Sequence, residues 1–130
     1  MKTEKGLQGN HEIREATIGA AFRVANALGS GFLEKVYENA LAIELRHAHH
    51  EVEQQKAIQV WYKGETVGLY QADLIVDGAV VVELKAVPSL DGAHRAQCLN
   101  YLRATRMETG LVINFGRPRI DVQRVTAAVC

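Results

Sequence analysis

The chain has 130 residues, of which 48% are hydrophobic and 23% charged, and these values predict one soluble globular domain and exclude a second. The apolar runs are far shorter than a membrane span, and no apolar stretch follows the first lysines, so we expect neither a transmembrane helix nor a secretory signal. The 15 basic and 15 acidic residues give zero net charge, which argues against a protein that binds nucleic acid by bulk charge alone.

The charge is unevenly distributed along the chain. Residues 1–85 have 9 Lys or Arg against 12 Asp or Glu (−3), whereas residues 86–130 have 6 Arg against 3 Asp or Glu (+3). The C-terminal part is therefore the better candidate for contact with a polyanion, although a solvated surface explains its arginines equally well. Cys98 lies in a helical pattern and Cys130 is the last residue, so we predict no disulfide framework and expect a reducing, cytoplasmic setting.

The N-terminal part predicts an arm followed by two helices. Residues 1–10 are polar and contain glycine, so we expect a flexible arm before a single domain over residues 11–130. Apolar residues then recur at helical spacing up to Gly29, which suits the position just after a helix end. The second helix should end in the cationic stretch 46–50. The expected helices span about residues 12–28 and 32–50.

The rest of the chain predicts strands around one further helix. Asp77-Gly78 joins two strand-like segments and is a strong hairpin signal, and Pro88 ends the second of them. A helix between strands permits a right-handed crossover onto the same sheet. The order ααβββαββ therefore predicts an α/β domain with a mixed sheet flanked by helices. The expected strands span about residues 57–62, 66–76, 79–87, 110–115 and 119–129, and the helix spans about residues 91–106.

The predicted hairpin contains three charged residues among its valines: Asp73, Glu83 and Lys85. Side chains two residues apart on a strand point to the same face, so Glu83 and Lys85 share a face. A two-residue turn would put Asp73 on the opposite face, whereas a three-residue loop over residues 76–78 puts all three on one face. We favour the longer loop, because Gly78 then takes its left-handed third position.

Two carboxylates on one face repel each other, and burying either of them unpaired is costly. A divalent metal resolves both problems, and hard oxygen ligands suit Mg²⁺ or Mn²⁺. Such a metal polarises a phosphoryl oxygen and acidifies a bound water, which Lys85 is placed to orient. An ordinary ion pair on an exposed sheet face explains the motif alone equally well, because the pattern D-x9-E-x-K is short.

Several motifs together resemble a known family. The Asp-x9-Glu-Leu-Lys pattern on a hairpin between helices resembles the PD-(D/E)XK nuclease superfamily. Residues 31–37, "GFLEKVY", are similar to the motif that names the GxxExxY family within it, although Ala72 replaces the superfamily's proline. The resemblance covers about residues 12–125 and continues through "YQADLIV", "VVELKAV", "HRAQCLNYL" and "GLVINFG". It implies a restriction-endonuclease-like fold and a nuclease that hydrolyses DNA phosphodiesters with one or two Mg²⁺ or Mn²⁺ ions.

The resemblance also implies roles for single residues. Asp73 and Glu83 would bind the metal, helped by the backbone carbonyl of Leu84, and Lys85 would serve the attacking water. Glu34 corresponds to the acidic residue that the superfamily often supplies from its first core helix, so we expect it to be catalytic and to bind metal directly or through water.

Four further residues are candidates for substrate binding. Tyr37 shares a helix face with Glu34, but a core tyrosine explains it equally well. Gln97 and Tyr101 are similar to the Q-x-x-x-Y helix of the RecB-like branch, which helps to position DNA, and plain helix packing is the alternative. His94 could reach a phosphate, although a surface histidine is the simpler interpretation.

Two other functions stay open at this point. The first is a non-catalytic nucleic-acid-binding or protein-interaction module that keeps the nuclease fold, and the second is an enzyme on RNA or a nucleotide. The intact Asp–Glu–Lys set argues against a pure binder. The sequence shows no appended recognition module, so a homodimer or a partner protein is a candidate source of the missing surface.

Overall fold

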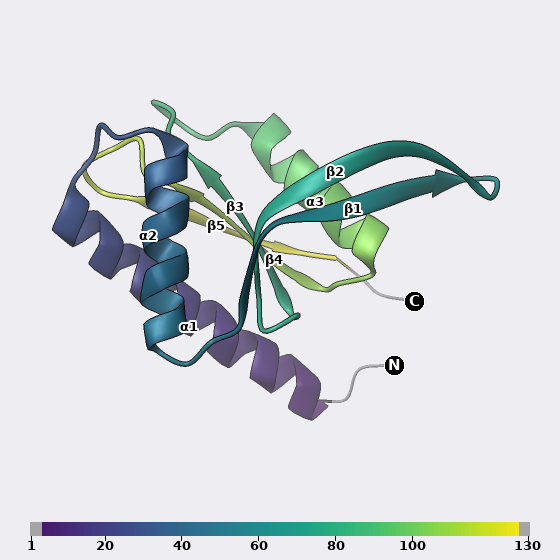
Figure 1. Ribbon diagram of the computed structural model, residues 1–130, viewed down its shortest axis with the longest axis horizontal. Coiled ribbons are helices and arrows are strands. Elements are labelled where there is room, and N and C mark those ends of the chain that lie inside the picture. The colour runs from purple at the N-terminus through teal and green to yellow at the C-terminus, as the bar shows by residue number, and fades with distance from the viewer. Residues whose placement is uncertain (1–3, 128–130) are drawn as a thin grey trace.

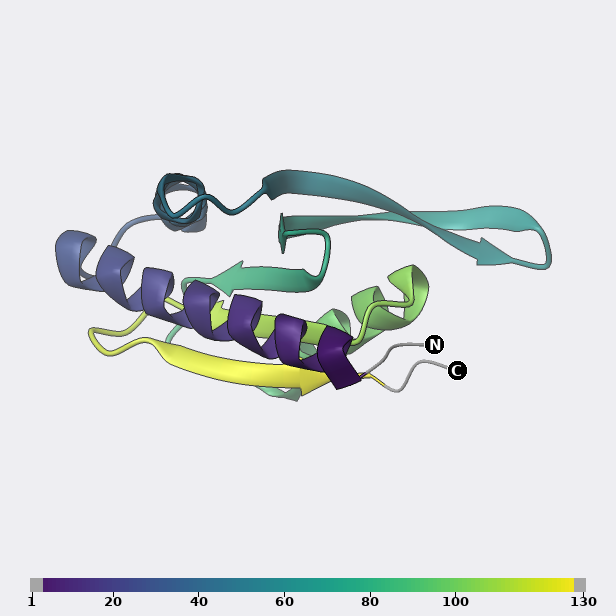
Figure 2. The same ribbon diagram turned by 90° about the horizontal axis from the view of Figure 1, so that it is seen from below.

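The computed structural model describes residues 4–127, in which five strands form one sheet with helices on both faces (Figures 1 and 2). The predicted order ααβββαββ is confirmed. The elements are α1 (Glu4–Leu28), α2 (Glu34–His47), β1 (Val52–Tyr62), β2 (Glu65–Val76), β3 (Val80–Lys85), α3 (Gly92–Thr105), β4 (Thr109–Asn114) and β5 (Asp121–Thr126).

The first helix begins earlier than the sequence pattern suggests. Residues 4–10, which we expected in a flexible arm, belong to α1, and Asn10 is already buried. Thr17 is also buried, and its hydroxyl donates to the carbonyl of Ile13 at 2.8 Å. Residues 1–3 and 128–130, the latter with Cys130, lie outside the described residues.

The sheet is mixed, as predicted, and its strands follow the order β1-β2-β3-β4-β5. Neighbours pair antiparallel except β3 and β4, which are parallel and are connected through α3. A parallel pair needs such a crossover, because its two strands start at the same end of the sheet. None of the helices in the described part has the length and apolar character needed to cross a bilayer.

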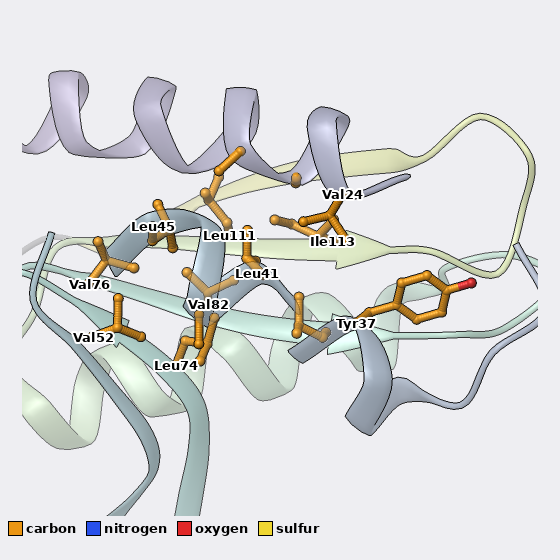
Figure 3. Close-up of a cluster of buried hydrophobic side chains, with 14 of the residues drawn as sticks. Val24, Tyr37, Leu41, Leu45, Val52, Leu74, Val76, Val82, Leu111 and Ile113 are labelled. Atoms are coloured by element: carbon orange, nitrogen blue, oxygen red, sulfur yellow. The ribbon is translucent and has the colours of Figure 1, made fainter. Parts of the chain in front are cut away.

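The sheet separates two hydrophobic cores. One lies under α1 and α2, where the Tyr37 ring stacks on Phe115 with centroids 4.6 Å apart. The other lies under α3 and includes Cys98, Tyr101 and Leu102. Figure 3 shows the first core, with labelled side chains from α1, α2 and four strands: Val24, Tyr37, Leu41, Leu45, Val52, Leu74, Val76, Val82, Leu111 and Ile113.

The β2–β3 hairpin has a three-residue loop, as we predicted, but the loop is residues 77–79 and not 76–78. Val76 pairs with Val80, so the predicted register is wrong by two residues while its parity is correct. Asp77 and Gly78 both have positive φ, at 52° and 63°. The left-handed conformation of Asp77 is stabilised because its carboxylate accepts from Glu51 N at 2.8 Å and contacts His50 Nδ1 at 2.6 Å.

Strand β2 leaves β3 after only three residue pairs, the last of which joins Leu74 to Val82. From there to its start, β2 pairs with β1 alone. The two strands continue as a ribbon that projects beyond the rest of the domain in both views (Figures 1 and 2). Asp73 therefore lies at the fork where β2 and β3 separate.

A tight contact fixes the segment that follows β3. The Asn114 amide donates to Val87 O at 2.9 Å and accepts from Val87 N and Gly116 N at 3.0 and 2.9 Å. A Cβ at position 116 would lie 2.2 Å from Val87 O, so only glycine permits this approach. The ends of β3 and β4 are thereby held side by side.

Candidate metal centre

The two expected metal ligands meet at the fork between β2 and β3. Asp73 and Glu83 are the next partners in register after Leu74 and Val82, and a direct pair shares one face of the sheet. Lys85, two residues along β3, is on the same face. Asp73 Oδ2 accepts from Leu84 N at 2.8 Å, so the carboxylate occupies the position where the β2 backbone no longer pairs.

Glu83 is the most perturbed carboxyl group of the site. Its side chain is buried, with 4% of the residue exposed, and Oε1 has no hydrogen-bond partner among the described residues. Burial, followed by the charge of Asp73, raises the pKa of Glu83 to about 9, and the charge of Lys85 opposes the shift only in part. Around neutral pH the metal-free protein therefore keeps a proton on Glu83.

A third carboxylate reaches Asp73 through a glutamine. Gln55 Nε2 donates to Glu38 Oε1 at 2.7 Å and to Asp73 Oδ1 at 3.2 Å. Gln54 Nε2 also donates to Glu38, at 2.8 Å. Neighbouring strand residues normally point to opposite faces, but Gln55 has a left-handed φ of 53°, which lets both amides reach one carboxylate. Strained backbone of this kind clusters at functional sites.

Glu38, and not Glu34, is the acidic residue of α2 that faces the site. Glu38 is buried with 4% exposed and also accepts from Lys35 Nζ at 2.9 Å. Glu34, which we expected to bind the metal directly or through water, is exposed in the first turn of the helix. The reason is helical geometry. Tyr37 turns into the core, so the next residue points along the sheet toward Gln55, while Glu34 lies one turn earlier at the open end.

The donor set fits a magnesium-type ion. Asp73 and Glu83 supply carboxylate oxygens, and one of these, Glu83 Oε1, is buried without a partner. Within residues 4–127, no three His, Cys, Asp or Glu side chains cluster in a way that could hold a metal. Mg²⁺ does not need three, because it commonly binds one or two carboxylates and keeps several waters for substrate phosphates.

The four expected substrate-binding residues occupy different environments. The Tyr37 hydroxyl donates to Gly29 O at 2.6 Å and accepts from Phe32 N, so it closes the turn between α1 and α2. His94 caps α3, since its Nδ1 accepts from Asp91 N at 3.2 Å. Gln97 is exposed. The Tyr101 ring is buried, and its hydroxyl donates to the carbonyl of Gln71, two residues before Asp73.

Sequence reasoning missed Glu38, Gln55 and the position of Cys98. Burial, followed by the charge of Glu83, raises the pKa of the Cys98 thiol to about 12, which identifies a neutral thiol beside the carboxyl pair. A faint signal existed for Gln55, because "EQQK" interrupts the alternation expected of a strand. Glu38 had no signal of its own, since an acidic residue beside an apolar stripe is an ordinary helix surface.

Comparison with known proteins gives a family match and a similar solved structure. Residues 11–125 match a family model described as the PD-(D/E)XK nuclease superfamily, whereas no curated protein sequence matches the chain. A solved structure described as the crystal structure of SSO0001 is similar at a TM-score of 0.56 and 19% identity, and this similarity shows the fold alone. The similarity covers 97% of this chain and 63% of that one, so the present chain spans less than two thirds of SSO0001. Because the family model covers nearly the whole chain, the protein belongs to the PD-(D/E)XK nuclease superfamily.

Proposed function

We propose that this protein is a Mg²⁺- or Mn²⁺-dependent nuclease that hydrolyses DNA phosphodiesters. One observation carries the proposal: Glu83 is buried beside Asp73 with a carboxylate oxygen that has no protein partner. An unsatisfied buried oxygen costs about 1–3 kcal/mol, and more when charged, so its retention needs a reason. A cation between the two carboxylates supplies that reason, and Lys85 on the same face suits hydrolytic chemistry.

The proposed roles follow from position. Asp73, Glu83 and the backbone carbonyl of Leu84 would hold the ion, which when bound would supply Lewis-acid stabilisation of phosphoryl charge. Lys85 would orient the attacking water and offset the developing negative charge. Glu38 acts through Gln55, whose amide fixes the rotamer of Asp73. In this proposal Glu34 has no direct contact with the ion.

The helix α3 completes the proposed substrate side. Gln97, Tyr101 and His94 lie on α3, which covers the same face of the sheet as the carboxyl pair. We also infer that the chain belongs to the narrower GxxExxY family, which the motif at residues 31–37 supports. The buried free thiol of Cys98 supports a cytoplasmic setting.

The competing function is a nucleic-acid-binding or protein-interaction module without activity. It explains the fold, but it gives no reason to bury the carboxyl group of Glu83 beside that of Asp73. A binder would be more stable with an uncharged pair at these positions. A second copy or a partner protein could extend the substrate surface of either form of the protein.

An activity screen decides between the two. Wild type, Lys85→Ala and Lys56→Ala are incubated with Mg²⁺ or Mn²⁺ on single-stranded, double-stranded and branched DNA, and on RNA. Lys56 is the matched control because it is an exposed lysine that pairs with Glu53 on β1. We expect cleavage by wild type and Lys56→Ala and a loss of about 100-fold or more in Lys85→Ala, the scale typical of a positioned proton-transfer or charge-stabilising group. Equal activity of all three proteins, or none in any, would remove the proposal.

A further inference from the structure

A groove runs between the β1–β2 ribbon and α3. It consists of two adjoining hollows of about 290 and 380 Å³, which share Tyr70 and Asn100 in their walls. Each is close in size to the lower end of small-ligand sites, roughly 300–1,000 Å³. The groove is lined by Val60, Tyr70, Ala93, Ala96, Gln97, Asn100, Tyr101, Arg103 and Ala104.

The side chains that line this groove carry no negative charge. The lining contains no Asp or Glu. Arg103 is exposed and makes no ion pair with any residue in the described part of the chain. Gln97 and Asn100 add neutral hydrogen-bonding groups. Three alanines have small side chains and leave open space beside α3. Such a surface suits an anionic ligand with polar edges.

Tyr70 gives the groove a flat apolar surface. It is 43% exposed, and its ring meets Tyr101 edge to face, with centroids 5.3 Å apart. Tyr101 is in turn anchored to Gln71, two residues from Asp73. The groove therefore ends beside the proposed metal ligands. An aromatic ring supported from below and open above is the usual platform for an unpaired base, whereas the bases of a duplex are already stacked on each other.

We propose that this groove binds an unpaired nucleic-acid strand, with one base stacked on Tyr70, the phosphate backbone near Arg103, and the strand directed toward Asp73 and Glu83. This inference rests on the proposed function for the direction of the strand and deepens it, because it names single-stranded nucleic acid as the substrate class. The neutral side chains of the groove bind polar base edges, and Arg103 provides the electrostatic contact with the phosphate backbone.

The test is equilibrium binding without divalent metal, so that it does not depend on cleavage. Fluorescently labelled oligodeoxythymidylate, oligouridylate and a duplex of equal length are titrated with wild type and with variants, and anisotropy is recorded. Tyr70→Ala removes the platform. Tyr62→Ala is the matched control, because Tyr62 is an exposed tyrosine on the same ribbon outside the groove. Ala96→Leu fills the groove from an exposed helix position where leucine is well tolerated.

We expect wild type to prefer either single strand over the duplex, and Tyr70→Ala to weaken single-strand binding about 5- to 150-fold, the range typical of base–aromatic stacking. Ala96→Leu should weaken it as well, and Tyr62→Ala should change it less than twofold. Tighter binding of oligouridylate than of oligodeoxythymidylate would assign the groove to RNA strands and support the inference. Equal losses in Tyr70→Ala and Tyr62→Ala, unchanged binding by Ala96→Leu, or a preference for duplex would overturn it.

The two proposals fail in different ways. Single-strand binding that depends on Tyr70, without cleavage in the presence of Mg²⁺ or Mn²⁺, would support the binding groove and refute the proposed nuclease activity. Cleavage that depends on Lys85 but is insensitive to Tyr70→Ala and Ala96→Leu supports the nuclease and overturns the groove.

Discussion

Glu83→Gln should change how the stability of the metal-free protein depends on pH. In wild type, burial beside Asp73 raises the pKa of Glu83 from 4.5 to about 9. Between these values the folded state keeps the proton and the unfolded state loses it, so stability falls as pH rises, by about 1.4 kcal/mol per unit. Glutamine has the same shape and does not titrate. From pH 5 to pH 8 wild type should therefore lose about 4 kcal/mol relative to the variant.

Thermal unfolding in EDTA at pH 5, 6, 7 and 8 measures this difference. For a domain of this size, 1 kcal/mol shifts Tm by roughly 3–5 °C, so Glu83→Gln should gain about 10 °C or more over wild type between pH 5 and pH 8. The exposed Glu65 serves as the control, and Glu65→Gln should follow wild type at every pH. A constant offset between wild type and Glu83→Gln would refute the reasoning, because it would show that Glu83 ionises like an exposed carboxylate.

Further predictions concern the metal, the glutamine bridge and the tight contact after β4. Excess Mn²⁺ should stabilise wild type by about 2.7 kcal/mol at a hundredfold excess over Kd, and thermal melts of Asp73→Asn should lose this response. Gln55→Glu should lower the metal-free Tm at pH 7, since it places a third carboxylate between Glu38 and Asp73, and melts at pH 7 and pH 4.5 test whether protonation reverses the loss. Gly116→Ala should lower the free energy of unfolding by an amount typical of overpacking, about 1–3 kcal/mol, and denaturant titration should show a lower midpoint, whereas Gly92→Ala, with open space at its Cβ, should leave the midpoint unchanged.

The fold could be predicted because its information is local. Hydrophobic periodicity identifies the helices and strands, and Asp77-Gly78 identifies the hairpin. The exact register could not be predicted, because it depends on contacts that Asp77 makes with His50 and Glu51, far away in the sequence. These contacts make the left-handed conformation of Asp77 favourable and move the loop forward by one residue.

In the candidate site, only the residues whose orientation follows from the alternation of side chains along a strand could be predicted. Asp73, Glu83 and Lys85 share a face in either odd-loop register, so an error of two residues left that prediction intact. The acidic residue of α2 was a different problem. Glu34 and Glu38 lie one turn apart on the same helix face, so the choice between them depends on where α2 lies along its axis relative to β1, where Gln55 contacts Glu38. No property of residues 31–37 alone reveals that placement.

The fork between β2 and β3 explains how a domain of this size can bury Glu83 beside the half-buried Asp73. Burial and the neighbouring charge on Glu83 together cost up to about 6 kcal/mol near pH 9, worked from the rise of its pKa from 4.5 to about 9. The same hairpin buries Val76, Val80, Val81 and Val82, each worth about 1.5–3 kcal/mol when removed from water. The valines hold the strands together up to Val82, so the carboxylates can lie where the pairing ends without separating the hairpin. A site one pair closer to the loop would interrupt the core. A site further along the ribbon would be exposed, and it would then lack the buried, unpaired oxygen that favours a metal at Glu83.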